Sequence, residues 1–525
     1  MEFVKLVTGE EMAEIDRRTI AAGTSGAELM ENAGRRVFDA IVEEWEGLEG
    51  LCPVVVCGRG NNGGDGFVIA RLLHQAGVAL RIFLTMSREM VKGDAAHHLR
   101  LLEEAGGRVE PLLSDEDLGV LREALDEGDL VVDALLGTGL KGAPRPEAAR
   151  IIECVMGADR PVVAVDLPSG LEAGTGLVHG ACMRAALTVT FGLPKIGHLF
   201  FPGRTYCGIL RLVDIGFSAE VIRTSPVSTF LLDEEGMAAL IPRRPDDAHK
   251  GTCGTVAVVA GSVGMTGAAT LAADAALRAG AGRVTLGLPS SLNDIVEVKL
   301  TEVMTLPLAE VRKRRCLALR GLGEILELSE NSDCLALGPG LGRYRETVEL
   351  VRRLVMQVKR PLVLDADGLF ALAGATDLLK EREGPIILTP HVGEFAHLTE
   401  LATEEVAADS LGHAGRFAVE HGVVLVLKGG PTVVALPDGR CLVNPTGNAG
   451  MATAGAGDVL TGLIAGLLGQ GMSPEKAACL GVYLHGRAGD LARDRIGEWG
   501  MSAGDIGHLL PRAILDTYAA DAERR

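Results

Sequence analysis

The first 220 residues alternate between stretches of helical periodicity and short apolar runs. Residues 10–22 and 26–45 place apolar side chains at helical spacing and therefore predict two helices that cover one face of a core. Further on, uninterrupted apolar runs are separated by stretches long enough for crossover helices. These runs are residues 54–57, 78–84, 130–133, 162–166, 186–191 and 209–213. Because strands of a parallel sheet are buried on both faces, continuous apolar runs of this kind predict a parallel α/β sheet.

The alternation stops between residues 217 and 251 and then starts again. This interval has a mixed polar sequence with Pro226, Pro242 and Pro245, which indicates a domain boundary. A helix of small residues is predicted at 267–279. Apolar runs predict strands at residues 255–260, 283–288, 334–337, 361–365, 385–388 and 423–427. No clear repeat relates the halves, so the sequence predicts two different α/β domains, at residues 1–220 and 227–525.

Composition and charge exclude several classes of protein. Hydrophobic residues are 47% and charged residues 23% of the chain, as in a folded globular protein. The net charge of −19 opposes non-specific binding to nucleic acids and anionic membranes. No apolar run reaches the length of a membrane span, and no leader-like apolar segment follows Met1. Because the scattered cysteines also form no C-x-x-C pair, we expect a protein of the reducing cytoplasm.

The most unusual loop follows the first predicted strand. Residues 58–66 read GRGNNGGDG, and the next helix begins directly after them. The glycines free the backbone to turn, while Asn61, Asn62 and Asp65 supply polar groups. A helix cap would explain Asp65 alone, but the loop as a whole exceeds what capping requires. We therefore interpret it as a ligand site at the carboxyl edge of the sheet.

Two other strands of this sheet are predicted to end in aspartate. Asp133 precedes the loop ALLGTGLKG, and Asp166 precedes LPSG, which contains Ser169. With Asn62 these residues form an oxygen-rich set without soft ligands, which suits an alkali or alkaline-earth cation. Either aspartate alone could instead cap the next helix, and their joint position at one sheet edge favours a functional site.

In the second half, the segment NAGMATAGAGDVL at residues 448–460 carries the strongest chemical signal. Gly455, Ala456 and Gly457 can present N–H groups to an anion at the N-terminus of the apolar helix that follows. Asp458 lies next to them and is interpreted as a general base towards a hydroxyl, with a helix-terminal charge as the alternative. The P-loop motif is absent from the sequence. The segment therefore predicts a phosphoryl-transfer site of another kind.

Two further loops of the second half contain candidate residues. Lys428 begins the sequence KGGPT after a predicted strand and could lie along a diphosphate, although a solvated loop lysine is the common alternative. His391 lies at another strand exit, between Pro390 and Glu394. The pair His97-His98 lies in a polar helical stretch and is expected at the surface.

Together these motifs resemble the bifunctional NAD(P)H-hydrate repair enzymes over nearly the whole chain. The first half resembles the NAD(P)H-hydrate epimerase domain through GNNGGDG (60–66), DALLGTG (133–139) and DLPSG (166–170). The second half is similar to the ADP-dependent NAD(P)H-hydrate dehydratase through LGPGLG (337–342), TPHVGE (389–394), KGG (428–430) and GAGD (455–458). The resemblance implies a Rossmann-like three-layer sandwich followed by a ribokinase-like α/β domain.

The resemblance also implies roles for individual residues. In the first half, the hydrated nucleotide would be lined by Asn61, Asn62, Gly63, Gly64, Asp65, Gly137, Thr138, Gly139, Leu140, Lys141, Gly142, Ala143 and Asp166, and potassium would be held by Asn62, Asp133 and Ser169. In the second half, the hydrated cofactor would be touched by Ala268, Gly340, His391 and Asp458, and the adenine nucleotide by Lys428, Gly429, Gly430, Pro431, Thr432 and Gly457. One departure is Met265, near which the family is expected to carry an aromatic residue, often tyrosine.

The reactions implied are epimerisation of the R and S forms of hydrated NADH and NADPH, and dehydration of the S form with conversion of ADP to AMP and phosphate. Asp133 or Asp166 would protonate the departing C6 hydroxyl in epimerisation, and Asp458 would deprotonate it in dehydration. The resemblance implies ADP as co-substrate, with potassium and magnesium as ions. A homo-oligomer is also expected, because small residues in helices such as 267–279 permit close helix packing between subunits. Two alternatives stay open: a ribokinase-like kinase for a small molecule fused to a regulatory domain, and a first half that only binds or acts as a scaffold.

Overall fold

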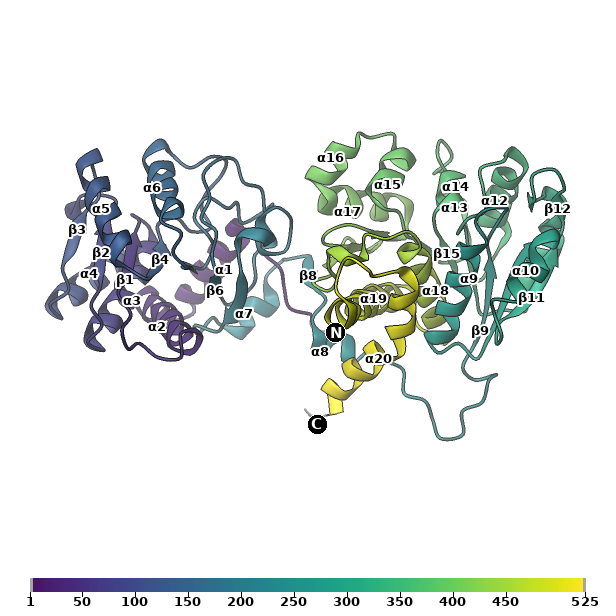
Figure 1. The fold of residues 1–525 in the computed structure, drawn as a ribbon, viewed down its shortest axis with the longest axis horizontal. Helices are drawn as coiled ribbons and strands as arrows, with labels where there is room; N and C mark the ends of the chain where they lie inside the picture. Colours follow the sequence, from purple (N-terminus) through teal and green to yellow (C-terminus); the bar gives the residue numbers. More distant parts are fainter. Residues whose placement is uncertain (1–2, 523–525) are drawn as a thin grey trace. The chain divides into compact units, whose positions relative to one another are not determined.

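The computed structural model describes residues 3–522, which divide into two compact units (Figure 1). Residues 5–227 form the first unit, and residues 228–522 with residues 3 and 4 form the second. Each unit contains a largely parallel sheet with helices packed on it, so the predicted α/β architecture is confirmed. Among residues 3–522 there is no helix with the length and hydropathy that a bilayer crossing requires.

The first unit is built on a seven-stranded sheet of order β3-β2-β1-β4-β5-β6-β7, in which all neighbouring strands are parallel. Its strands are β1 (Pro53–Cys57), β2 (Arg81–Leu84), β3 (Val109–Pro111), β4 (Leu130–Ala134), β5 (Val162–Val165), β6 (Leu187–Phe191) and β7 (Ile209–Val213). Its α-helices are α1 (Gly9–Ala21), α2 (Gly26–Glu44), α3 (Asn61–Gln75), α4 (Gly93–Glu104), α5 (Asp115–Glu127), α6 (Pro146–Gly157) and α7 (Ala219–Thr224).

Strand β1 shows why the apolar runs are continuous. Val55 and Cys57 belong to the core cluster that α2, α3 and α4 form on one face of the sheet. Val54 and Val56 belong to the cluster that α5 and α6 form on the other face. Because successive side chains point to opposite faces and both faces are covered, every position of this strand is buried.

The second unit contains a ten-stranded sheet of order β11-β10-β9-β14-β15-β16-β17-β18-β19-β8, in which β18 is antiparallel to β17 and β19. Its strands are β8 (Thr229–Leu231), β9 (Thr255–Val259), β10 (Arg283–Pro289), β11 (Met304–Leu308), β14 (Cys334–Leu337), β15 (Leu362–Leu364), β16 (Ile386–Leu388), β17 (Val424–Leu427), β18 (Val433–Ala435) and β19 (Cys441–Val443), beside a separate pair β12 (Glu310–Val311) and β13 (Cys316–Leu317). Its α-helices are α8 (Glu234–Ala238), α9 (Thr266–Arg278), α10 (Asn293–Glu297), α11 (Leu322–Glu330), α12 (Arg345–Gln357), α13 (Asp367–Phe370), α14 (Leu378–Glu381), α15 (Val392–Thr399), α16 (Thr403–Ala408), α17 (Ser410–His421), α18 (Ala456–Gly469), α19 (Pro474–Ile496) and α20 (Ala503–Ala522).

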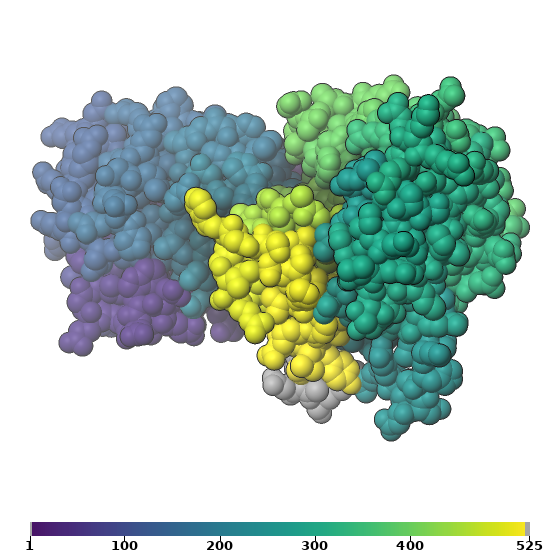
Figure 2. All heavy atoms as spheres, turned by 45° about the vertical axis from the view of Figure 1, so that its right-hand side comes forward, coloured from purple at the N-terminus to yellow at the C-terminus, as the bar shows by residue number. Residues whose placement is uncertain are grey.

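The small residues of α9 allow close packing inside the second unit. A Cβ added to Gly462 of α18 would lie only 2.0 Å from the backbone oxygen of Ala272, so the two helices touch through their backbones. Helix α20 packs against α9, α8 and α19 and lies at the surface of this unit, where Figure 2 shows it in yellow. The small-residue face of α9 is therefore filled within the chain.

The interval 217–251, where the alternation was expected to stop, contains α7, β8 and α8. An expectation about one side chain was wrong. His98 is buried rather than at the surface: its Nε2 lies 3.0 Å from the backbone oxygen of Ala27, and its Nδ1 lies 3.7 Å from Glu31. The polar sequence of α4 concealed this position because α2 and α3 cover that side of the helix.

Candidate active sites

The predicted potassium ligands of the first unit lie in one hydrogen-bonded cluster beyond the ends of β4 and β5. Ser169 donates from its Oγ and from its backbone N–H to the carboxylate of Asp133, at 2.6 and 2.8 Å. Ser169 Oγ also accepts the backbone N–H of Leu136 at 2.8 Å. Asn62 Nδ2 donates to the backbone oxygen of Leu136 at 3.0 Å. The residues that the sequence placed at this edge are thus in contact through one loop.

Asp133 of this cluster is fully buried, and burial raises its pKa to about 6, although the hydrogen bonds from Ser169 and Leu135 oppose this. A bound cation would offset the cost of a buried carboxylate. The cluster offers oxygens from a carboxylate, an amide, a hydroxyl and a backbone carbonyl, and hard cations prefer such ligands. These residues therefore fit potassium.

A cavity of about 200 Å³ lies beside this cluster. Its wall includes Asn61, Asn62 and Asp65 of the glycine-rich segment, together with Gly137, Thr138 and Asp166. Gly63 and Gly64 lie in the first turns of α3, where a side chain would clash with Gly58 and with Met30. Gly139 to Ala143 form a loop that does not line the cavity, and Lys141 of this loop pairs with Glu10 of α1. The structure thus brings part of the predicted set to one cavity.

Asp166 is the charged residue most closely held in this cavity. The buried ammonium of Lys195 lies 2.5 Å from its Oδ1, and Thr190 Oγ1 donates to the same oxygen at 2.9 Å. Burial opposes ionisation of Asp166, but Lys195 outweighs it and the pKa of Asp166 is lowered. The φ angle of Asp166 is 65°, in the left-handed region that few residues other than glycine adopt. Its carboxylate lines the cavity.

The segment 448–460 of the second unit forms the turn that begins α18. Gly455 has a φ of 95°, and a Cβ on it would lie 2.6 Å from Leu271 Cδ1 of α9, so glycine is needed there. Asp458 lies in the first turn of the helix and is half-buried. Burial and the neighbouring charge of Asp365 raise its pKa to about 7, although Lys428 opposes the rise. A carboxyl group with this pKa can act as a base at neutral pH.

Lys428 lies beside this turn, between carboxylates. Its Nζ is 2.9 Å from Asp365 Oδ1 and 3.8 Å from Glu394 Oε2. Burial lowers the pKa of Lys428, but these carboxylates outweigh it and raise the pKa. Thr461 Oγ1 donates to the other oxygen of Asp365 at 2.8 Å. A Cβ on Gly457 would lie 3.1 Å from Nζ, so the predicted nucleotide-binding residues Lys428 and Gly457 are adjacent.

The remaining predicted residues of this unit lie around the same edge of the sheet. His391 caps α15 through its Nδ1, and its Nε2 lies 3.6 Å from Glu394. A Cβ on Gly340 would lie 3.2 Å from Ala268 and 2.8 Å from Met265. The Met265 side chain is 38% exposed. At this position the chain presents a flexible thioether to solvent, where the resemblance predicts an aromatic ring.

Gly429, Gly430, Pro431 and Thr432 continue the loop after Lys428. Thr432 Oγ1 donates to the backbone oxygen of Gly429 at 3.3 Å, which closes this short turn. Gly429 and Gly430 are exposed, so their backbone can be approached from solvent. The predicted nucleotide segment is therefore an accessible loop next to the buried end of Lys428.

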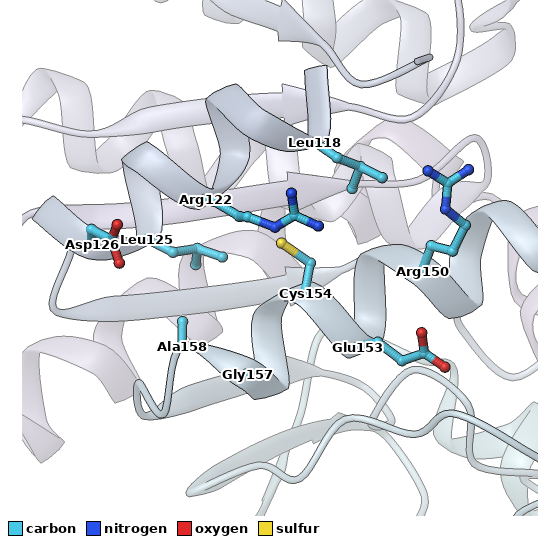
Figure 3. Close-up of a pocket in the computed structure, with 9 residues that line it drawn as sticks. All are labelled: Leu118, Arg122, Leu125, Asp126, Arg150, Glu153, Cys154, Gly157 and Ala158. Carbon is cyan, nitrogen blue, oxygen red and sulfur yellow. The ribbon is translucent and has the colours of Figure 1, made fainter. Parts of the chain in front are cut away.

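A larger cavity, of about 470 Å³, lies between α5 and α6 (Figure 3). Its wall contains Arg122, Arg150, Glu153 and Cys154, and Arg150 is paired with Asp115. No residue predicted from the sequence lines it. Side chains of both charges line this cavity, and it contains none of the residues of the polar clusters at the strand ends.

Several residues of these sites were missed by the sequence analysis. Lys195, Thr190 and His198 surround Asp166, and Asp365 holds Lys428. Asp365 was visible as the last residue of the strand predicted at 361–365, where the sequence DADG begins. Lys195 was visible as a lone lysine in an apolar segment, LPKIG, directly after the strand at 186–191. A charged residue in such a segment needs a buried partner, and this was the signal.

Fold and sites together define a two-unit α/β enzyme with a polar cluster at the carboxyl edge of each sheet. A family model described as NAD(P)H-hydrate dehydratase matches residues 256–512, and one described as YjeF-related protein N-terminus matches residues 26–197. The chain is 46% identical to the bifunctional NAD(P)H-hydrate repair enzyme Nnr of Moorella thermoacetica, over 97% of this chain and 96% of that protein. The chain belongs to the family of bifunctional NAD(P)H-hydrate repair enzymes.

One further relative agrees with this membership, and one solved structure is similar to part of the chain. The enzyme of the same name from Thermofilum pendens is 39% identical over 97% of this chain and 96% of its own length. The crystal structure of the ADP/ATP-dependent NAD(P)H-hydrate dehydratase of Bacillus subtilis, co-crystallised with ATP and Mg²⁺, is 34% identical. It covers 55% of this chain and 98% of that chain, with a TM-score of 0.48.

Proposed function

We propose that this chain repairs hydrated NADH and NADPH with two active sites. The first unit, of the epimerase type, interconverts the R and S hydrates. The second unit, a ribokinase-like dehydratase, converts the S hydrate to NAD(P)H while ADP becomes AMP and phosphate. Family membership over nearly the whole chain supports this proposal. The observation that carries it is Asp458, a carboxyl group with a pKa of about 7 in the first turn of α18, beside Lys428.

The dehydration can be written from the residues at the start of α18. Asp458 removes the proton from the C6 hydroxyl, whose oxygen attacks the β-phosphorus of ADP as AMP leaves. The N–H groups at Gly455 to Gly457 and the Lys428 ammonium stabilise the charge on the transferred group. The lone pair of the ring nitrogen then expels phosphate from C6. Loss of a proton from C5 restores the double bond of the dihydronicotinamide ring.

Magnesium is proposed as an ion of the second site. Among residues 3–522, no cluster of three or more His, Cys, Asp or Glu side chains forms a complete metal site. Magnesium often takes only one or two protein carboxylates and completes its shell with phosphates and water. Glu394, next to Lys428, would hold it together with the ADP phosphates. The positive charge of the magnesium ion would offset the negative charge of the ADP phosphates.

In the first unit, Asn62, Asp133 and Ser169 would hold potassium. The ion would order the loop around Leu136 that carries the cavity residues Gly137 and Thr138. Epimerisation requires that the C6 hydroxyl leaves as water and that water returns to the other face of the ring.

The ten cysteines are all unpaired thiols, which supports the proposal of a reducing, cytoplasmic setting. Assembly into a homo-oligomer stays a prediction.

The proposal is tested by incubating the full chain with ADP and a mixture of R and S NADH hydrate. We expect both isomers to disappear, with recovery of NADH absorbance and release of AMP and phosphate in equal amounts. A kinase for a small molecule would instead leave a stable phosphorylated product. Consumption of the S isomer alone would contradict the epimerase assignment and support a first unit that only binds.

A further inference from the structure

The cavity of about 200 Å³ in the first unit, which lies beside the Asp133 cluster, is acidic for a site that receives a dinucleotide. Four carboxyl groups line it: Asp16 from α1, Asp65 from α3, Asp94 from α4, and Asp166 after β5. Lys195 is the lysine in its wall. A wall with this balance of charge stabilises a cation rather than a phosphate. Loss of the C6 hydroxyl leaves the nicotinamide ring as such a cation.

Lys195 fixes the charge of one of these four groups. Its side chain is 0% exposed and donates to Asp166 Oδ1, to Thr190 Oγ1 at 2.9 Å and to the backbone oxygen of Phe191 at 3.2 Å. His198 Nε2 lies 3.0 Å from the backbone oxygen of Asp166. A buried ammonium with this partner keeps Asp166 ionised, since either charge alone would be left uncompensated. Asp166 is therefore a poor proton donor.

Asp65 lines the same cavity, but its environment favours the protonated form. It is 8% exposed, on a helix whose other first-turn residues are Asn and Gly. Burial, with the neighbouring carboxylates of Asp166 and Asp16, raises its pKa well above the usual value. Two carboxyl groups in one cavity thus have their proton affinities driven apart, and such pairs divide the roles of acid and charge stabiliser.

Asp133, the other carboxyl group that the sequence offered as an acid, does not line the cavity. Both of its oxygens accept hydrogen bonds from Ser169, and Oδ1 also accepts the N–H of Leu135. The Asp133 carboxylate is therefore held by Ser169 and Leu135 and does not face a substrate in the cavity.

We propose that Asp65 is the acid of the epimerase site and that Lys195 is a positioning residue that keeps Asp166 as the carboxylate facing the cationic ring. The inference rests on the proposed epimerase function. Asp65 gives its proton to the C6 hydroxyl, the C6–O bond breaks as the ring nitrogen lone pair forms the C6=N bond, and water leaves. Another water adds to the opposite face of C6 and releases a proton to solvent, and Asp65 regains one from solvent. No oxidant or other reactant is consumed.

The first test compares Asp65→Asn with wild type and with Asp126→Asn, which changes an exposed carboxyl group on α5. Chromatography of the R and S isomers measures interconversion without ADP. We expect Asp65→Asn to lower it at least about a hundredfold, the usual contribution of a general acid, and Asp126→Asn to leave it unchanged. Dehydration of purified S hydrate with ADP, measured on the same samples, reports that the second unit is intact.

The outcomes separate the two proposals. If wild type does not interconvert the isomers, the epimerase function itself is wrong. If wild type interconverts them and Asp65→Asn does so within about threefold, the assignment of Asp65 is overturned while the epimerase function stands. Circular dichroism of the same samples checks that Asp65→Asn is folded.

The second test measures the pH dependence of interconversion in Lys195→Met. Lys195 and His198 are the charged or titratable groups next to Asp166, and the other carboxyl groups that line its cavity are Asp16, Asp65 and Asp94. Without Lys195, Asp166 binds a proton at higher pH, so interconversion should fall on acidification where wild type keeps its rate. An unchanged pH profile overturns the role of Lys195. If Lys195→Met does not fold, Thr190→Val, which removes one hydrogen bond to each partner, should shift the profile less and in the same direction.

Discussion

The two sites of this chain use the same pair of residue types in different ways. In the first unit, Lys195 pairs with Asp166, which itself lines the cavity. In the second unit, Lys428 pairs with Asp365, which is almost fully buried, and Asp458 stands nearby with a raised pKa. Each site therefore has one carboxylate paired with a lysine and a second carboxyl group with a raised pKa, which is Asp65 in the first unit and Asp458 in the second.

The difference lies in what surrounds this pair. The first cavity has carboxyl groups from several elements, which favours a cationic ring. The second site has the N-terminus of α18, whose backbone N–H groups favour an anion. The first unit therefore favours a positive charge on the ring, and the second unit favours a phosphoryl group. In the proposed reactions, the hydroxyl at C6 would leave as water from the first unit and as phosphate from the second.

The largest expected effect is that of Asp458→Asn. The amide cannot accept the proton of the C6 hydroxyl, so ADP-dependent dehydration should fall by about 10²–10⁴. Interconversion of R and S hydrate should stay at the wild-type rate, because that chemistry belongs to the first unit. Recovery of NADH from pure S hydrate and chromatography of the isomers measure the two reactions. Equal losses in both would show that the sites are not independent.

The anion-binding turn is tested by Gly455→Ala. The new Cβ would lie 2.6 Å from Leu271 and 3.0 Å from Ala503, on a residue with a φ of 95°. Strain of about 1–3 kcal/mol at the turn should lower dehydration or weaken ADP binding by about tenfold or more. The matched control is Gly471→Ala, where φ is 86° and no atom lies within 4 Å of the new Cβ. Only Gly455→Ala should change the KM for ADP.

Dehydration by the second unit should depend on pH through Asp458. A base with a pKa of about 7 makes dehydration rise about tenfold between about pH 6 and about pH 8. The raised pKa means that the folded chain binds this proton more tightly than the unfolded chain does. Stability from Asp458 is therefore lost as pH rises from about 4 to about 7, and Asp458→Asn should melt higher than wild type at pH 8 but not at pH 4. Melting curves at both values check the sign.

The smallest effect is expected at Met265. Replacing it by tyrosine supplies the aromatic ring that the resemblance predicts next to Gly340. Stacking worth about 0.5–1.5 kcal/mol should lower the KM for S hydrate about two- to tenfold and leave interconversion unchanged. A KM that stays the same or rises would indicate that the exposed Met265 side chain does not face the hydrated ring.

The sequence was most informative where strands were long and buried on both faces. The runs that became β1, β4 and β9 were found nearly to the residue, because apolar content alone marks them. Strands β3, β8, β11, β12, β13, β18 and β19 were missed, whereas β15 and β16, which have only three residues each, were found within apolar runs. The glycine-rich segments were located from composition, but residues 61–66, which were predicted as a loop, form the first turns of α3.

The charges that tune the sites could not be found in this way. Lys195 and Asp166 are far apart along the chain, as are Lys428 and Asp365, and only the parallel sheet brings their strand ends to one edge. Asp16 and Asp94 belong to helices that look like ordinary surface helices in sequence.

By itself, the sequence determined the kinds of chemistry available: two α/β units, glycine-rich turns at strand exits, and aspartates beside them. Only the tertiary structure decided which aspartate is paired, which is buried, and which can exchange a proton. The physical reason is that the proton affinity of a carboxyl group depends on burial and on charges within a few ångströms. Both are set by residues that are distant along the chain and meet only when the sheet forms.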